Sequence, residues 1–171
     1  FPRQPDGDRL CLADYVWPRG EAQSRARVTG ATPVWDNVCL FAVTAGSGIR
    51  EAYQRFRDRG ELLLSHAIQA LAVETAEATA EWLHGQLRGQ WGFPDDPRMT
   101  MKDRFQARYR GRRYSFGYPA CPDLAMQKTL FDLLRPEEIG IRLTETFMME
   151  PEASVSAVVF HHPACRYFDA S

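Results

Sequence analysis

The strongest constraint on the fold of this chain is a helical repeat of apolar and small residues between Glu61 and about Gln90. Residues of this kind recur three or four positions apart, as they do on one face of an α-helix. The repeat consists of Leu64, Ile68, Leu71, Ala72, Ala76, Ala80, Leu83 and Leu87. Gly92, Pro94 and Pro97 follow it, and glycine and proline interrupt helices. The pattern therefore predicts one long helix that ends near residue 90.

Strand patterns lie on both sides of this helix. Leu10–Val16 and Val38–Thr44 are short runs of strand-forming residues, and a polar stretch between them predicts a long connection. Ile141–Met149 alternates apolar and polar residues, and Val155–Phe160 is a second β run soon after it, so these two are predicted to pair as antiparallel strands. Further helices are predicted at Ile49–Arg59, Thr100–Tyr109 and Asp123–Leu134, the last with Asp123 as its N-terminal cap. Strands near both ends with helices between them indicate an α+β fold.

Composition and charge exclude several classes of protein. The chain has 171 residues, of which 44% are hydrophobic and 25% charged, as expected of a single globular domain over residues 1–171. A net charge of −1 gives no electrostatic case for nucleic-acid binding, and no apolar run approaches the roughly 20 residues of a membrane helix. The cysteines, Cys11, Cys39, Cys121 and Cys165, are widely spaced, which is typical of reduced thiols in a cytoplasmic protein. Because the chain begins with Phe1 and not with Met, we expect it to be a segment of a longer protein.

One decapeptide, Arg113 to Pro122, combines a permanent cation with a stiff turn. Arginine offers a planar fork that matches a carboxylate or a phosphate. Four residues later, Gly117-Tyr118-Pro119 restricts the backbone, and Pro122 restricts it again. A rigid segment that carries one cation can cradle a small molecule. An ordinary surface loop with an exposed arginine explains the same spacing equally well.

Three glutamates on the long helix form an acidic stripe. Glu74, Glu77 and Glu81 lie three and four residues apart and therefore share one face. Such a stripe is usually a solvated face. Glu77 differs slightly from the others, because the small residues Ala76 and Ala80 beside it would let a ligand approach the helix.

Other reactive side chains give weaker signals. His161 and His162 close the last predicted strand, where neighbouring side chains point to opposite faces, so no metal site is predicted. No residue that could activate Cys121 as a nucleophile is recognisable. Tyr167 and Phe168 are expected to divide their roles, with one ring packed in the core and the other facing a cleft or solvent.

The decapeptide resembles the S-adenosylmethionine-binding signature of the activation domain of cobalamin-dependent methionine synthase. Its pattern is Arg113-x-x-x-Gly117-Tyr118-Pro119-Ala120-Cys121-Pro122. Further segments resemble this family in the family's order: residues 11–15, 41–46, 76–84, 143–147, 151–156 and 162–167. The resemblance thus extends along most of the chain.

The resemblance implies an α+β domain with a central twisted antiparallel sheet, flanking helices and a shallow groove for S-adenosylmethionine. Arg113 would bind the carboxylate of the ligand, and Glu77 would lie near its positively charged end. Tyr118 and Ala120 would belong to the turn at the mouth of the groove, with Tyr118 facing the corrin ring. Tyr167 and Phe168 would form the aromatic pair that contacts the ligand.

The resemblance also implies the reaction and the partners. The domain would support reductive methylation of cob(II)alamin to methylcobalamin, as part of a methyltransferase. The cobalamin would be held by a cobalamin-binding partner domain, and flavodoxin or a related flavoprotein would supply the electron. The domain itself would position the ligand, without a catalytic general base.

Some features depart from the family. Tyr114-Ser115-Phe116 occupies a spacer that usually contains prolines, and Leu62-Leu63-Leu64 replaces a polar stretch. The family domain begins further upstream with a helical portion that contributes an acidic ligand contact, so the chain is expected to be the C-terminal part of that domain. Two other interpretations stay open: a non-catalytic module that docks on a corrinoid protein, and a hydrolase that uses Cys121.

Overall fold

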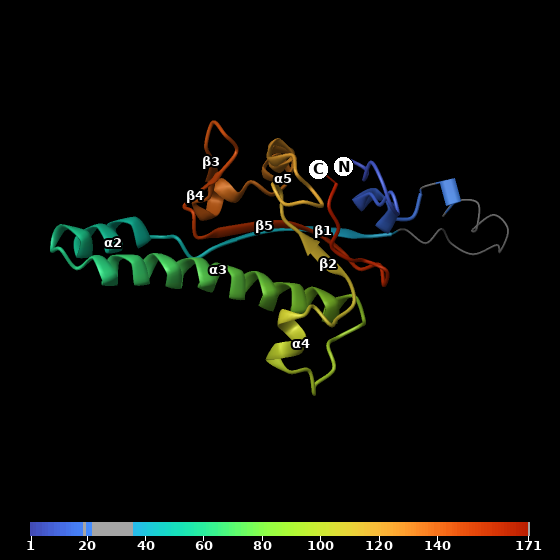
Figure 1. Cartoon of the computed structure of the whole chain (residues 1–171), viewed down its shortest axis with the longest axis horizontal. Helices are drawn as coiled ribbons and strands as arrows, with labels where there is room; N and C mark the ends of the chain where they lie inside the picture. The colour runs from blue at the N-terminus through green and yellow to red at the C-terminus, as the bar shows by residue number, and fades with distance from the viewer. Residues whose placement is uncertain (19, 22–35, 171) are drawn as a thin grey trace.

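A three-stranded antiparallel sheet forms the centre of the molecule in the computed structural model, which describes residues 1–18, 20–21 and 36–170 (Figure 1). Strand β5 (Ser154–Phe160) lies between β1 (Val38–Thr44) and β2 (Arg112–Tyr114), and every residue of β5 is buried. Together with the helices around it, this sheet confirms the predicted α+β class. The connection predicted between residues 17 and 37 lies mostly outside the described residues.

Helix α3 (Leu62–Gln90) covers one face of the sheet. Val155, Ala157 and Val159 alternate along β5 toward this helix and pack in one buried cluster with Ala76 and Ala80. Because alanine has no side chain beyond Cβ, the helix axis can approach the strands closely. This close approach brings the polar side chains of α3 over the edge strand β2. None of the helices in the described residues is both long and apolar enough to cross a membrane.

The opposite face of the sheet carries an aromatic core. Tyr114 and Phe160 project from β2 and β5 and pack with Tyr15, whose ring is stacked on that of Tyr114 at 6.2 Å between centroids. Helix α5 (Gln127–Leu134) closes this core with Leu130 and Phe131. Asp123 caps the short 3₁₀ helix η2 (Leu124–Met126) that leads into α5, as predicted, by accepting the N–H of Ala125 at 2.9 Å.

The remaining helices follow the sequence pattern. Helix α2 (Ile49–Asp58) packs beside the first part of α3, and α4 (Met101–Phe105) is a shorter version of the helix predicted at Thr100–Tyr109. A capping box formed by Thr100 and Asp103 fixes the start of α4.

The strand predicted at Leu10–Val16 is wrong. The structure has a 3₁₀ helix, η1 (Leu12–Tyr15), at this position. Its first turn is closed by Asp14, whose backbone N–H donates to the carbonyl of Cys11 at 2.9 Å and whose side chain accepts the N–H of Cys11 at 3.1 Å. Leu12 and Tyr15, three residues apart, can then both enter the core, which an alternating strand would not allow.

The long strand predicted at Ile141–Met149, and its pairing with β5, are also wrong. The segment forms a small hairpin of β3 (Arg142–Leu143) and β4 (Met149–Glu150), which follows the 3₁₀ helix η3 (Pro136–Ile139). Thr144 closes the turn, because its N–H donates to the Met148 carbonyl and its hydroxyl accepts the Met148 N–H. Both edges of β5 are already paired with β1 and β2, so the segment has no free edge to join.

The apolar stripe predicted on α3 is correct only in its second half. Leu64 and Leu71 are exposed, whereas Ala72, Ala76 and Ala80 are buried. The reason is geometric: the first turns of α3 extend with α2 beyond the end of the sheet, so no strand lies beneath them (Figure 1).

Candidate functional site: an arginine between an edge strand and a long helix

The register of β2 decides where Arg113 points. Arg113 lies opposite Val159 of β5, and Tyr114 lies opposite Val158. Residues that face each other across an antiparallel pair share a face of the sheet. Since Val159 packs toward α3, Arg113 does too, while Tyr114 enters the aromatic core on the other face.

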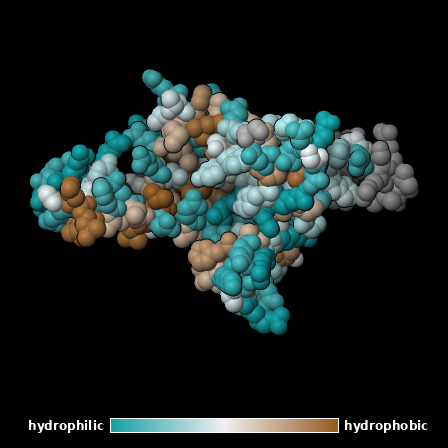
Figure 2. Space-filling model, viewed as in Figure 1, coloured by the Kyte–Doolittle hydropathy of each residue, from teal (hydrophilic) through white to brown (hydrophobic). Residues whose placement is uncertain are grey.

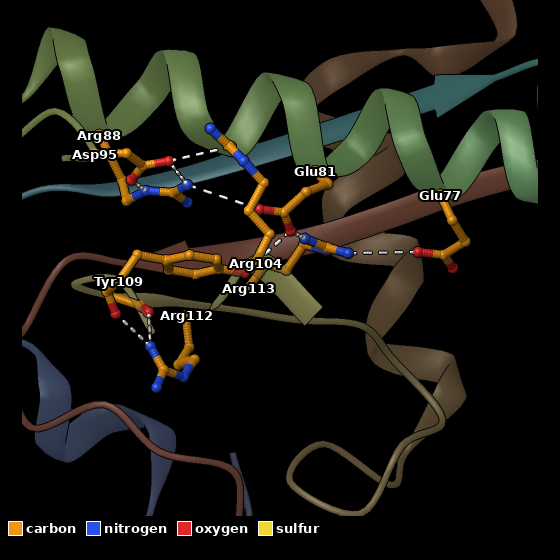
Figure 3. Close-up of polar contacts among 9 residues, drawn as sticks. Glu77, Glu81, Arg88, Asp95, Arg104, Tyr109, Arg112 and Arg113 are labelled. Atoms are coloured by element: carbon orange, nitrogen blue, oxygen red, sulfur yellow. Dashed lines mark hydrogen bonds and ion pairs between the residues drawn. The ribbon is translucent and has the colours of Figure 1, made fainter. Parts of the chain in front are cut away.

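The guanidinium of Arg113 contacts two glutamates of α3 (Figure 3). Its Nη1 donates to Oε2 of Glu81 in a short hydrogen bond, and its Nη2 lies 3.5 Å from Oε2 of Glu77. The Arg113 side chain is 18% exposed and that of Glu77 is 49% exposed. Burial alone would lower the pKa of Arg113, but the hydrogen bond and the charge of Glu81 raise it, so the arginine stays charged.

A tight turn follows β2 and is held by backbone hydrogen bonds. Gly117 has φ of 80°, a left-handed conformation that favours glycine, and its N–H donates to the carbonyl of Cys121 at 2.8 Å. The N–H of Cys121 donates in turn to the carbonyl of Tyr118 at 2.7 Å. The C-terminal segment is tied to the same turn, because the N–H of Ala170 donates to the carbonyl of Pro119 at 2.8 Å.

A cavity of about 540 Å³ lies between this turn, α3 and the C-terminal segment. All six residues that the sequence predicts for the site line this cavity. The full lining consists of Glu77, Arg113, Tyr114, Ser115, Tyr118, Pro119, Ala120, Tyr167, Phe168 and Asp169. The volume is within the range of pockets that hold a small organic molecule.

The aromatic residues of the cavity wall divide their roles as expected. Phe168 packs against the core, with its ring 6.4 Å from the rings of Tyr15 and Tyr114. Tyr167 and Tyr118 are exposed at the cavity. The cavity is thus lined both by the charged groups of Arg113 and Glu77 and by aromatic rings.

The model of one protein family matches residues 2–171: the activation domain of vitamin B12-dependent methionine synthase. The chain belongs to this family. It is 36% identical over 182 residues to methionine synthase of Mycobacterium leprae (strain TN) and 35% identical over 181 residues to that of Mycobacterium tuberculosis (strain ATCC 25618 / H37Rv). Each match covers 99% of this chain but only 14% of the relative, so the chain spans about a seventh of these proteins.

A solved structure shares the fold of this activation-domain chain. It is the crystal structure of the MetH reactivation domain bound to AdoHcy, with a TM-score of 0.81 and 31% sequence identity. The match covers 99% of this chain and 51% of the other.

Behind the cavity lies a charged cluster that sequence reasoning missed. Arg88 of α3 is completely buried and binds Asp95 through two nitrogens, at 2.5 and 2.6 Å. Its Nη2 lies 3.7 Å from Oε1 of Glu81, and its Cζ lies 3.7 Å from the centre of the Tyr109 ring. The spacing of Glu77, Glu81 and Arg88 by helical turns was the available signal, but it does not distinguish a buried charged face from a solvated one.

His84 is buried beside this cluster and is uncharged at neutral pH. Burial, reinforced by the positive charges of Arg88 and Arg113, lowers the pKa of His84 to about 3. Its ring packs edge-on against Tyr109, with 5.3 Å between centroids.

The other reactive residues take part in local structure. Nε2 of His161 lies 2.8 Å from Oδ1 of Asp36, and Nδ1 of His162 accepts the N–H of Ala164. No group of three potential metal ligands occurs among the described residues. All four cysteines are free thiols. Burial raises the pKa of the Cys121 thiol to about 11, which disfavours the thiolate that a cysteine hydrolase requires.

Proposed function

We propose that this chain binds S-adenosylmethionine in the cavity beside Arg113. The observation that carries the proposal is a fixed cation, Arg113, that is paired with two carboxylates and lines, together with one of them, Glu77, an aromatic cavity of about 540 Å³. The ligand has a carboxylate, an ammonium and a sulfonium, and its adenosine has flat apolar faces. A site for it needs a cation, an acid and aromatic walls, and this cavity contains all three.

The charges of site and ligand are complementary. The charged residues that line the cavity, Arg113, Glu77 and Asp169, together carry a net charge of −1, and the zwitterionic amino acid with its sulfonium carries +1. Arg113 would form charge-assisted hydrogen bonds with the carboxylate of the ligand. Glu77 is suited to the cationic end, because its half-exposed side chain is held only by a 3.5 Å contact and can turn toward the ligand.

The aromatic residues would enclose the rest of the molecule. Tyr167 and Tyr118 expose their rings at the cavity, and Phe168 lies beneath. Ala120 is buried in the turn and lines the cavity with its small side chain.

Within the whole protein, we propose that the domain supports reductive methylation of cobalamin held by a cobalamin-binding domain. The protein would be a cytoplasmic methyltransferase that synthesises methionine, with flavodoxin or a related flavoprotein as electron donor. The chain would be the C-terminal part of its activation domain. The sulfonium makes the methyl group a good electrophile, so the residues of the chain contribute binding and orientation. Tyr118 is exposed and lines the cavity, and a docked corrin ring would meet it there.

Calorimetry with S-adenosylmethionine tests the proposal. Arg113→Ala should weaken binding by about 100-fold or more, because the carboxylate loses its only charged partner among the cavity-lining residues of the described chain. Arg142→Ala, which removes an exposed arginine on β3 far from the cavity, is the matched control and should bind normally. If the unsubstituted chain and its Arg113→Ala variant gave the same isotherm, the proposal would be wrong. A cavity that binds no S-adenosylmethionine would favour the non-catalytic docking module.

A further inference from the structure

The two glutamates that contact Arg113 are held very differently. Oε2 of Glu81 accepts two hydrogen bonds, one from Nη1 of Arg113 and one from the Tyr109 hydroxyl at 3.0 Å. Within the described part of the chain, Glu77 makes one long polar contact, to Arg113, and its side chain is 49% exposed. Glu77 lines the cavity, whereas Glu81 is not among the lining residues and lies behind the guanidinium.

Glu81 is itself backed by a rigid group of side chains (Figure 3). The guanidinium of Arg88 is clamped by both oxygens of Asp95 and lies over the ring of Tyr109, so it has little freedom to rotate. Arg104 adds a further contact to Asp95 at 3.3 Å. Oε1 of Glu81 faces Arg88 at 3.7 Å, and it is buried without a hydrogen-bond partner. A carboxylate in this setting keeps its position better than one in solvent.

We propose that Glu81 is a positioning residue for Arg113, which it orients toward the ligand carboxylate. This inference rests on the proposed function. By engaging Nη1 from behind, Glu81 leaves the Nη2 edge of the guanidinium directed at the cavity, where only the loosely held Glu77 competes for it. When the ligand carboxylate takes that edge, Glu77 is released to meet the ammonium and the sulfonium.

Position and charge have opposite effects here, and this makes the inference testable. Removal of a negative charge beside Arg113 would, by charge alone, strengthen the attraction between Arg113 and a carboxylate. Loss of the hydrogen bond would instead let the guanidinium rotate away from its binding orientation. If a Glu81 variant binds the carboxylate ligand more weakly, Glu81 therefore acts by positioning Arg113.

The test is calorimetry on the full chain with two ligands. S-adenosylmethionine carries the carboxylate, and its decarboxylated analogue keeps the amine and the sulfonium but lacks the carboxylate. Glu81→Ala should weaken the binding of S-adenosylmethionine by about 10-fold or more, the usual effect of a lost hydrogen bond to a charged group. It should change the affinity for the analogue by less than about 3-fold. Glu81→Gln keeps an oxygen acceptor at the same place and should recover most of the affinity. Glu74→Ala, which removes an exposed glutamate two turns earlier on α3, should bind both ligands normally.

A double-variant cycle identifies the route of the effect. In an Arg113→Ala background, Glu81→Ala should cost no further affinity, measured with ligand concentrations high enough to detect the weak binding. Tyr109→Phe removes one donor to Glu81 and should produce a smaller loss in the same direction. It also provides a second variant if Glu81→Ala fails to fold.

The outcomes separate this inference from the proposed function. If the unsubstituted chain does not bind S-adenosylmethionine, the proposed function falls and this inference falls with it. If the unsubstituted chain binds while Glu81→Ala binds equally well, or loses both ligands equally, the inference alone is overturned.

Discussion

The first half of helix α3 exposes leucines, whereas the second half buries charged and polar side chains. In the first half, residues 62–71, the leucines face solvent: Leu63 is 82% exposed and Leu71 is 67% exposed. In the second half, residues 72–90, Arg88 and His84 are completely buried. Figure 2 shows the hydrophobic surface that results at the end of the molecule where α2 and α3 meet. Burial in this helix follows the position of the sheet, not the hydropathy of the residues.

Buried charge is tolerated in the second half because each charge has a partner. An isolated charge in a protein interior costs several kcal/mol, and a well-formed pair offsets most of that cost. Arg88 is paired with Asp95, and Glu81 with Arg113 and Tyr109. The same arrangement that makes this half stable places a fixed cation at the cavity.

Arg88→Met should produce the largest loss of stability in the helix. The substitution leaves Asp95 partly buried and without its main partner, and breaking a buried pair in this way costs about 3–5 kcal/mol. Urea unfolding followed by circular dichroism measures the change. Arg57→Met on the exposed face of α2 is the matched control and should stay within about 0.5 kcal/mol of the unsubstituted chain. Equal effects of the two substitutions would show that buried Arg88 contributes no more to stability than an exposed arginine.

Ala80→Leu should be the next most costly change. Ala80 is fully buried between α3 and the sheet, in the cluster that contains Phe41 and Ala157, so extra methyl groups force the layers apart. Overpacking of this kind costs about 1–3 kcal/mol. Ala67→Leu introduces the same side chain at an exposed position of the first half and should be nearly neutral in the same unfolding experiment. A neutral Ala80→Leu would show that the helix does not lie tightly on the strands.

His84 should make the second half sensitive to acid. Its pKa is about 3 in the folded chain and about 6.5 in a model peptide, so between these values the unfolded state binds a proton that the folded state rejects. Stability should therefore fall as the pH is lowered through 6.5, and His84 should account for about 1.4 kcal/mol of the loss between pH 8 and pH 5.5. Unfolding curves at both pH values, for the unsubstituted chain and for His84→Leu, isolate this contribution. An unchanged pH dependence in the variant would contradict it.

Sequence patterns predicted the elements whose signal is local. The length of α3, the strands β1 and β5, and the Asp123 cap depend on neighbouring residues, and the structure has them. The hairpin at residues 142–150 shows the limit of such patterns. The alternation of apolar and polar residues predicts a strand there. The structure has a hairpin, because Thr144 forms hydrogen bonds within its own turn and both edges of β5 are already paired.

The residues predicted for the site line one cavity, but the side chains that support Arg113 were not predicted from the sequence. The resemblance to the family pointed to Arg113 and Glu77, and both line the cavity. Spacing predicts that the acidic stripe is solvated, which holds for Glu74 but not for Glu81. Glu81 is partly buried because it binds Arg113, which lies on a strand more than 30 residues away in sequence. Only the register of β2 against β5 reveals this contact.

Leu63→Gln should have the smallest effect of the four substitutions, although it replaces a leucine by a polar residue. Leu63 is 82% exposed, so the leucine gains little from burial and glutamine loses little by comparison. Both residues also have good helix propensity. The free energy of unfolding should change by less than about 0.5 kcal/mol, measured in urea at two protein concentrations. A loss above about 1 kcal/mol that grows with concentration would mean that copies of the chain cover this leucine in solution. The first half of α3 would then be buried like the second, by a neighbouring molecule in place of the sheet.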